Sequence, residues 1–189
     1  MDVILTQGKK TSAFSARFGM RNLSTSGSVL MNNGDRIYLR GTLECCIFPL
    51  TGTPPTDKEG WNKVFSVAKA YGLNHLRFHS WCPPQAAFEV ADDMGFYLQV
   101  ELPLWSLTVG KDTTTNRFLY EEADRILKEY GNHPSFCLMS VGNELQPDFD
   151  FLNNLRSYMK SKDNRHLYTT TTFTFEKGHG DWPETGDDF

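Results

Sequence analysis

The sequence of 189 residues lacks the features that mark several common classes of protein. No run approaches the ~20 apolar residues that a membrane-spanning helix needs, so we expect no membrane partner. Residues 1–5 lack the basic start and long apolar core of a signal peptide, and nothing else in the sequence assigns a compartment. The net charge is −4 and no basic cluster occurs, which argues against nucleic acid as a partner.

Motifs for metals, disulfides and nucleotides are also missing. The four cysteines, Cys45, Cys46, Cys82 and Cys137, form no Cys-x-x-Cys pair. Three of the four stand in or beside apolar runs. We therefore expect buried free thiols rather than zinc ligands or disulfides. No Gly-x-Gly-x-x-Gly follows the first expected strand, which removes support for a nucleotide-binding sheet. No metal and no cofactor are expected.

The sequence does contain a regular alternation of strands and helices from about residue 36. Apolar residues at helical spacing run from Trp61 to Tyr71 and stop at Gly72, and Gly131 to Pro134 give a second strong stop signal. The expected strands are 37–46, 75–78, 96–102, 135–141 and 167–172, and the expected helices are 61–71, 83–94, 117–130 and 149–160.

This order implies a parallel sheet built through right-handed crossovers, which both a doubly wound sheet and a β/α barrel have. Polar residues stand at the ends of successive strands, and this favours the barrel, whose active-site groups lie there. A closed barrel needs eight strands and typically ~250 residues. We therefore expect an α/β fold in which residues 36–189 form a (β/α)8 TIM barrel truncated to about its first five βα units. The last strand would leave an open edge, which is a liability for solubility.

Residues 1–35 differ in character from the rest of the chain. Residues 13–21 are typical of the last strand of an earlier β domain, and Asn32-Asn33-Gly34-Asp35 is typical of a hairpin turn. We expect this segment to be the end of a preceding β domain and a linker.

The most informative feature is the dipeptide Asn143-Glu144, which ends the apolar run that begins at Ser135. A Glu at a strand tip suits a general acid/base that protonates a glycosidic oxygen, and a neighbouring Asn can hydrogen-bond a sugar hydroxyl. The structural alternatives are a helix-capping or salt-bridged Glu144 and a turn residue at Asn143.

Other strand ends carry further candidates for sugar binding. Glu101 ends the third strand, where it could bind a hydroxyl or tune Glu144, although an ion pair with Arg77 is nearly as well supported. His79 and Trp81 follow the second strand, and either could line a subsite or serve packing alone. Glu44 stands at the end of the first strand.

Two more tryptophans could lie near such a site. Trp105 follows the third strand and could line the pocket or pack. Trp182, with its acidic neighbours, could form an active-site loop, but no spacing there selects a metal.

Several short motifs follow one another along the chain: Phe18-Gly19-Met20-Arg21, Asn33-Gly34, Leu39-Arg40-Gly41, Tyr71-Gly72-Leu73-Asn74-His75-Leu76-Arg77, Gly131-Asn132-His133-Pro134-Ser135 and Gly142-Asn143-Glu144. In this order they resemble glycoside hydrolase family 2 over roughly residues 14–172. The resemblance implies a passage from an immunoglobulin-like β-sandwich, residues 1–35, into a catalytic barrel. It also implies a retaining mechanism, in which Glu144 protonates the leaving oxygen and Asn143 holds the sugar's 2-hydroxyl.

The chain departs from the family pattern in three ways. The family's nucleophile is a second Glu on a later strand that the chain does not reach. At most a remnant of the family's amino-terminal domains is present. His79 comes two residues after Arg77, whereas many members place a His three residues after that Arg.

We therefore expect part of a retaining β-glycosidase that is inactive alone and whose partner is a carbohydrate. A β-galactosidase is the first choice, followed by a β-mannosidase or β-glucuronidase. One rival is a non-catalytic carbohydrate-binding or scaffold module. Another is a family 5-like barrel glycosidase, which shares the Asn-Glu pair, but the Phe-Gly-Met-Arg and Leu-Arg-Gly motifs speak against it. The oligomeric state stays open.

Overall fold

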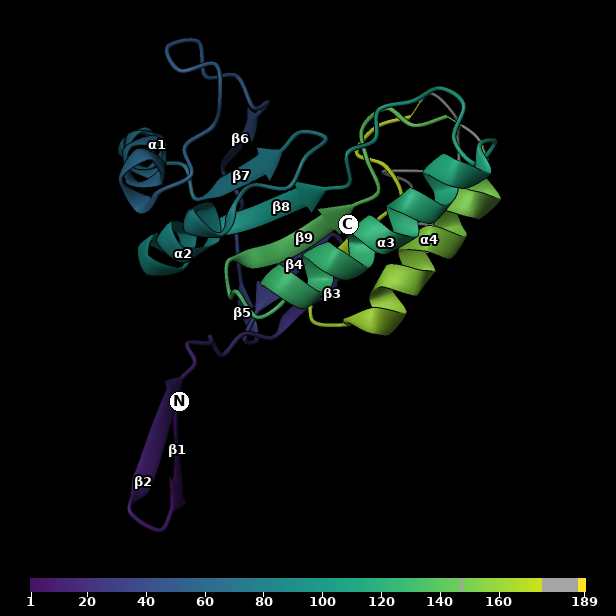
Figure 1. Ribbon diagram of the computed structural model, residues 1–189. Helices are drawn as coiled ribbons and strands as arrows, with labels where there is room; N and C mark the ends of the chain where they lie inside the picture. Colours follow the sequence, from purple (N-terminus) through teal and green to yellow (C-terminus); the bar gives the residue numbers. More distant parts are fainter. Residues whose placement is uncertain (147, 175–186) are drawn as a thin grey trace.

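The computed structural model describes residues 1–146, 148–174 and 187–189. Its centre is a five-stranded parallel sheet with four helices (Figure 1). The strands are β6 (Gly41–Glu44), β7 (His75–Phe78), β8 (Tyr97–Glu101), β9 (Phe136–Ser140) and β10 (Leu167–Thr169). The helices are α1 (Lys58–Ala70), α2 (Gln85–Met94), α3 (Thr113–Tyr130) and α4 (Phe149–Lys162).

The strands lie side by side in the order in which they occur in the chain, β6 to β10, and each neighbouring pair is parallel. A doubly wound sheet reverses its strand order at a switch point, and the described strands have no such reversal. The sequential order is that of successive units in a β/α barrel. The prediction of a mixed α/β fold with five parallel strands is confirmed.

The helices begin and end close to where the sequence placed them, because the signals are local. Asp57, Asp112 and Asp148 cap α1, α3 and α4 by accepting hydrogen bonds from first-turn amides. The cap at Asp112 starts α3 four residues before the expected Arg117. The first strand is shorter than the expected 37–46, since only Gly41–Glu44 pairs with β7.

The main core lies between the sheet and the helices. Leu76 and Phe78 of β7 are buried, and Trp61 of α1 packs edge-on against Phe78 with ring centroids 5.9 Å apart. Because side chains alternate along a strand, this arrangement leaves Arg77 on the opposite face. One face of the sheet is therefore apolar and covered, and the other can present polar side chains.

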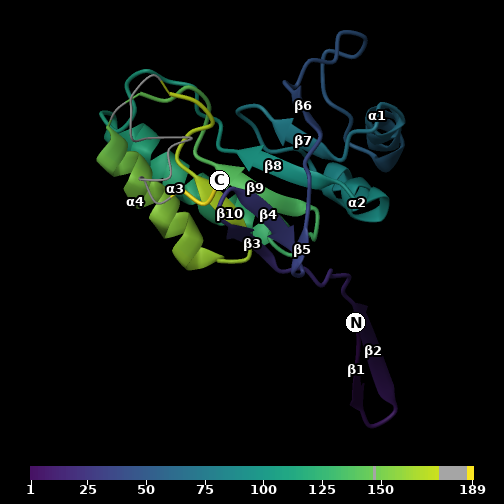
Figure 2. The same ribbon diagram turned by 180° about the vertical axis from the view of Figure 1, so that it is seen from behind.

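A second, small cluster packs on the opposite face. Cys137, Leu138 and Leu167 are buried there, with Leu23 and Leu30 packed against them. The latter two belong to an antiparallel sheet of β3 (Leu23–Ser26), β4 (Val29–Asn32) and β5 (Asp35–Arg36). The views in Figures 1 and 2, from opposite sides, show α2 and α3 in front of the parallel sheet in one and β3–β5 in front of it in the other.

The predicted turn between β4 and β5 is confirmed, with φ of 54° at Asn33 and 86° at Gly34. Farther toward the amino terminus, β1 (Asp2–Gln7) and β2 (Lys10–Ser15) form an exposed hairpin that projects away from the rest (Figure 1). The expected strand at 13–21 is therefore only partly right, because β2 ends at Ser15.

The expectation of four buried thiols is wrong in part. All four cysteines are free, but Cys45 and Cys46 are exposed, Cys82 is half-buried and only Cys137 is fully buried. The first two follow β6, an edge strand that pairs on one side only with β7, so no neighbouring strand covers them.

The open edge expected after the fifth strand is partly occupied. The Tyr168 amide donates to the Asp188 carboxylate over 3.0 Å, and the Thr170 amide donates to Asp187 over 2.8 Å. The Asp188 amide in turn donates to the Tyr168 carbonyl. Among the described helices, none has the length and apolar character that crossing a membrane requires.

Candidate active site

Arg77 is the centre of a hydrogen-bonded network at the carboxyl ends of the strands. Its Nε donates to Glu101 Oε1 over 2.7 Å, which joins the tip of β7 to the tip of β8. Its Nη2 donates to Asn143 Oδ1 and to Thr172 Oγ1, both over 2.6 Å. The guanidinium of β7 therefore links the last residue of β8 to residues that follow β9 and β10.

The carboxylate of Glu101 is fully buried and doubly bonded. Oε1 accepts from Arg77, and Oε2 accepts from the Ser80 amide over 2.7 Å. With both oxygens engaged and no exposed surface, this group holds Arg77 in place and is not free to attack a substrate. The ion pair between Glu101 and Arg77, one of the alternatives from the sequence, is present.

Glu144 lies beside this network and makes a different contact. It is half-buried, and its Oε2 accepts a hydrogen bond from Trp105 Nε1 over 3.1 Å. The preceding residue, Asn143, is 5% exposed and is turned toward Arg77. The two residues of the dipeptide thus contact different partners, a cation for the amide and an indole for the acid.

The backbone at Glu144 is in the left-handed region, with φ of 50°. Ser80, after β7, has φ of 55°. Such conformations are uncommon for residues other than glycine and cost free energy, so they concentrate where side chains must be aimed for function. The left-handed turn at Glu144 directs its side chain away from that of Asn143.

Two backbone segments are joined around the acid. The Asn143 amide donates to the Leu104 carbonyl over 3.1 Å, and the Gln146 amide donates to the Ser106 carbonyl over 3.3 Å. These bonds flank the pair formed by Trp105 and Glu144. Gly142 permits the approach, since a Cβ there would lie 2.2 Å from the Leu104 carbonyl oxygen.

Among the remaining candidates from the sequence, His79 contacts Trp105, whereas Trp81 and Glu44 make other contacts. The His79 ring lies nearly perpendicular to that of Trp105, with centroids 5.1 Å apart, so it contacts the residue that is bonded to Glu144. Trp81 packs against Phe78 and donates its indole N–H to the Glu44 carbonyl over 3.2 Å. The Trp81 ring thus makes packing contacts, and its role in a sugar subsite stays a prediction.

Glu44 lies at the tip of β6, as expected, but its carboxylate bonds locally. Both oxygens accept from the Cys46 amide, at 3.2 and 3.1 Å. Burial raises the pKa of the Glu44 carboxyl above its ordinary value.

Thr172 is a member of the network that the sequence analysis did not single out. It lies three residues beyond β10 and was expected to end the fifth strand, so the rule that polar residues at strand ends converge would have found it. Trp182 lies outside the described residues. No group of three or more His, Cys, Asp or Glu in the described part of the chain is arranged to hold a metal ion.

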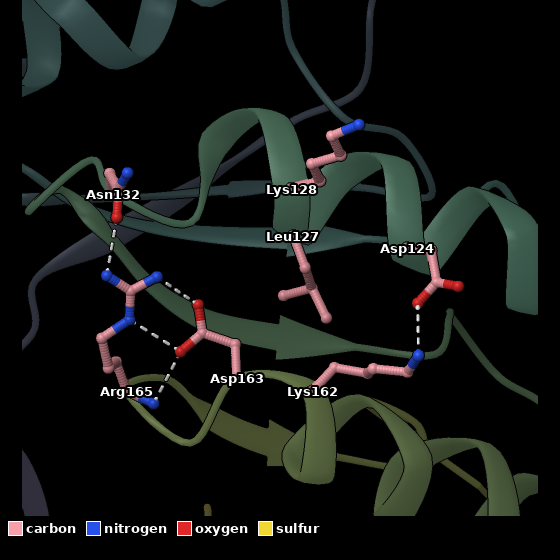
Figure 3. Close-up of a pocket in the computed structure, with 7 residues that line it drawn as sticks. All are labelled: Asp124, Leu127, Lys128, Asn132, Lys162, Asp163 and Arg165. Carbon is pink, nitrogen blue, oxygen red and sulfur yellow. Dashed lines mark hydrogen bonds and ion pairs between the residues drawn. The ribbon is translucent and has the colours of Figure 1, made fainter.

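A cavity of about 470 Å³ lies elsewhere, where α3 and α4 end (Figure 3). Five of its six polar side chains pair with one another: Arg165 donates to Asn132 and Asp163, and Lys162 lies 3.7 Å from Asp124. Because these residues precede β9 and β10, the cavity lies at the amino ends of those strands, opposite the network around Arg77. The mutual pairing of these five side chains gives them a structural role.

The chain was compared with family models, curated proteins and solved structures. No family model matches the chain. A curated protein of Formosa agariphila, provisionally named a β-glucuronidase, is 28% identical over 123 residues, which cover 62% of this chain and 14% of that protein.

Two solved structures share the fold. A β-galacturonidase of glycoside hydrolase family 2 from Eisenbergiella tayi, bound to galacturonate, has a TM-score of 0.73 and 16% identity over 84% of this chain and 29% of that one. A β-glucuronidase from Ruminococcus gnavus, in complex with a C6-substituted uronic isofagomine, has a TM-score of 0.77 and 19% identity over 89% of this chain and 31% of that one.

The resemblance to glycoside hydrolase family 2 is confirmed. The chain spans less than a third of the length of each of these relatives. By their names, these relatives are glycosidases.

Proposed function

We propose that this chain is the first part of the catalytic barrel of a retaining β-glycosidase, preceded in residues 1–35 by the end of an immunoglobulin-like domain. Glu144 is the general acid/base, and Asn143 binds the 2-hydroxyl of the sugar. Arg77 and Glu101 hold that amide in place, and His79 lies beside the bound sugar. Trp81 and Glu44 complete the rim of the substrate site on the side of β6.

The reaction would proceed in two steps. In the first, Glu144 gives a proton to the glycosidic oxygen, the bond from that oxygen to the anomeric carbon breaks, and a carboxylate nucleophile bonds to the carbon. In the second, Glu144 takes a proton from a water molecule that displaces the nucleophile. We place the nucleophile on a strand outside these 189 residues, because Glu101 is buried with both oxygens engaged.

The observation that carries this proposal is the pairing of a fixed amide with an accessible acid at one strand end. Asn143 is locked by Arg77, while Glu144 is held through one oxygen by Trp105. That arrangement leaves Glu144 Oε1 for proton transfer. A capping Glu would instead accept from amides in the first turn of a helix, and Asp148 has that role for α4.

The sugar is proposed from the relatives and from the sequence together. The related enzymes act on glucuronides and galacturonides by name, and one is bound to galacturonate. A β-linked uronic acid is therefore placed ahead of the β-galactoside and β-mannoside suggested by the sequence. Titrations of the full chain, followed through its amide chemical shifts, rank the affinities for four sugars. These are methyl β-glucuronide, β-galacturonide, β-galactoside and β-mannoside.

Chemical rescue tests the role of Glu144 in a chain that lacks its nucleophile. We expect 4-methylumbelliferyl β-glycosides to stay intact with the chain alone. With azide added, the azide bonds to the anomeric carbon, Glu144 protonates the departing oxygen, and an α-glycosyl azide forms. The Glu144→Gln variant should lose this reaction, while Glu121→Gln, on the exposed surface of α3, should keep it.

Each result decides between the functions considered. Equal aglycone release by wild type and Glu144→Gln overturns the acid/base assignment. Sugar binding without azide-dependent release supports the non-catalytic carbohydrate-binding module instead. If none of the four sugars shifts the amides of Asn143 or Glu144, the carbohydrate function itself is rejected.

A further inference from the structure

We propose that Trp105 forms the leaving-group subsite, a flat surface on which the aglycone of the glycoside rests while Glu144 protonates the bond to it. This inference rests on the proposed function and adds a residue to it. The ligand class is a β-glycoside whose aglycone is aromatic or is a second sugar ring.

The Trp105 ring is held by two contacts. Its Nε1 donates to Glu144 Oε2 over 3.1 Å, and its ring is nearly perpendicular to that of His79, with centroids 5.1 Å apart. It therefore bridges the residues that follow β7 and β9 while belonging to the segment that follows β8. These contacts orient the indole and leave most of its surface exposed.

The backbone on both sides of Trp105 is fixed as well. The Leu104 and Ser106 carbonyls accept hydrogen bonds from the Asn143 and Gln146 amides. Two residues farther on, the Asp148 amide donates to Val109 over 2.7 Å. A ring whose neighbours are tied in this way is oriented before a ligand arrives, which lowers the entropic cost of binding.

Exposure distinguishes Trp105 from the other described tryptophans. Trp105 is 62% exposed, whereas Trp61 is fully buried and Trp81 is packed against the core. An exposed indole whose N–H is already bonded to a carboxylate has its apolar face free for a ligand. Aromatic faces of this kind bind other rings through apolar burial and stacking.

The position of the Trp105 ring suits contact with the aglycone and not with the sugar on the other side of the cleaved bond. Asn143 and Arg77 form the polar side of the site, which suits the hydroxyl-rich sugar. Glu144 bonds instead to Trp105. The oxygen that Glu144 protonates departs with the aglycone. A ring bonded to the acid is thus adjacent to the group that leaves.

A comparison of two ligands and four proteins tests the proposal. Methyl and phenyl β-glucuronide share the sugar and differ in the aglycone, and each is titrated into the full chain by calorimetry. The variants are Trp105→Ala, Trp105→Phe and, as a control, Tyr71→Ala, which removes an exposed aromatic ring at the opposite end of the sheet.

We expect wild type and Tyr71→Ala to bind the phenyl glycoside about two- to tenfold more tightly than the methyl glycoside. Trp105→Ala should bring that ratio to about one, and Trp105→Phe should keep most of it. A ratio that is the same in all four proteins overturns the subsite but leaves the proposed function standing. Failure of wild type to bind either glycoside rejects the proposed function and the subsite with it.

A spectroscopic signature tests the link to the acid separately. The indole N–H resonance of Trp105, assigned by its disappearance in Trp105→Phe, should move upfield in Glu144→Gln, because an amide oxygen is a weaker acceptor than a carboxylate. An unchanged resonance would show that the ring is not bonded to Glu144 in solution.

Discussion

Arg77 Nε lies 2.7 Å from Glu101 Oε1, and the carboxylate side chain in that pair has no exposed surface. The pair joins β7 to β8 at the end of the sheet where Asn143 is held. Two charges removed from water are tolerated only with excellent geometry and further hydrogen bonds. The Ser80 amide and the Asn143 and Thr172 oxygens supply those bonds.

Removing one partner of this pair should strongly destabilise the chain. Glu101→Ala leaves a cation without its buried partner, and we expect the free energy of unfolding to fall by about 3–5 kcal/mol. Urea denaturation measures this loss of free energy of unfolding. Replacing both residues, Arg77→Met with Glu101→Leu, should cost less than Glu101→Ala alone.

The exposed pair between Arg125 and Glu121 is the matched control for that measurement. Surface pairs contribute little, so Arg125→Ala should change stability by less than about 1 kcal/mol. A loss at Glu101 no larger than that at Arg125 would contradict a structural role for the buried pair.

Acidification should destabilise the fold through His75. Burial lowers the pKa of His75 from its ordinary value near 6.5 to about 4, so the folded state takes up this proton less readily than the unfolded state does. The contribution of neutral His75 to the free energy of unfolding is therefore fully present above pH 6.5 and is lost as the pH falls toward 4. The full loss amounts to about 3 kcal/mol.

Urea titrations at pH 7, 6 and 5 measure this dependence. His75→Gln keeps a donor for the Tyr97 carbonyl, which the ring nitrogen contacts over 2.8 Å, but cannot be protonated. The variant should therefore lose less stability between pH 7 and 5 than wild type. Parallel curves for the two proteins would show that His75 is not the group responsible.

The strands and helices were predictable because their signals lie within the sequence of each element. The apolar run at 135–141 contains β9, Phe136–Ser140, and His75–Phe78 was identified without error. The sequential strand order was not fixed by the sequence, since the same alternation suits a doubly wound sheet. The exposed hairpin β1–β2 was missed because its strands bury no face and so show no clear apolar period.

The residue types of the candidate site were predictable from the sequence, but their hydrogen-bond partners were not. Position at strand ends is enough to group Arg77, Glu101 and Asn143 from the sequence alone, yet the bond from Arg77 to Thr172 spans 95 residues. The bond from Trp105 to Glu144 depends on two irregular segments whose conformations have no periodicity. Thr172 could therefore be inferred only from the convergence of strand ends, and the bond from Trp105 to Glu144 could not be inferred from any local pattern.

Gly142 should be intolerant of any side chain. A Cβ there would lie 2.2 Å from the Leu104 carbonyl oxygen, a backbone atom that cannot move without separating the segments that hold Trp105 and Glu144. We expect Gly142→Ala to destabilise the chain by about 2 kcal/mol or more. The Trp105 indole resonance should shift in the same protein.

Gly8→Ala serves as the control, because Gly8 has φ of 60° with nothing near its Cβ position and lies in the hairpin far from the site. Its cost should be about 1 kcal/mol, from backbone conformation alone. Equal costs at the two glycines would show that the contact with Leu104 is not tight.

The two carboxylates at the end of the chain should protect the edge of β10. Asp188 accepts from the Tyr168 amide and Asp187 from the Thr170 amide, so they occupy donors that would otherwise offer a template for another strand. In Asp187→Ala/Asp188→Ala we expect faster hydrogen exchange at Tyr168 and Thr170 and greater light scattering on concentration. Asp150→Ala, which removes an acidic residue in the first turn of α4, should leave both unchanged. If exchange at Tyr168 and Thr170 is as slow in the double variant as in wild type, the edge is protected by something other than these carboxylates.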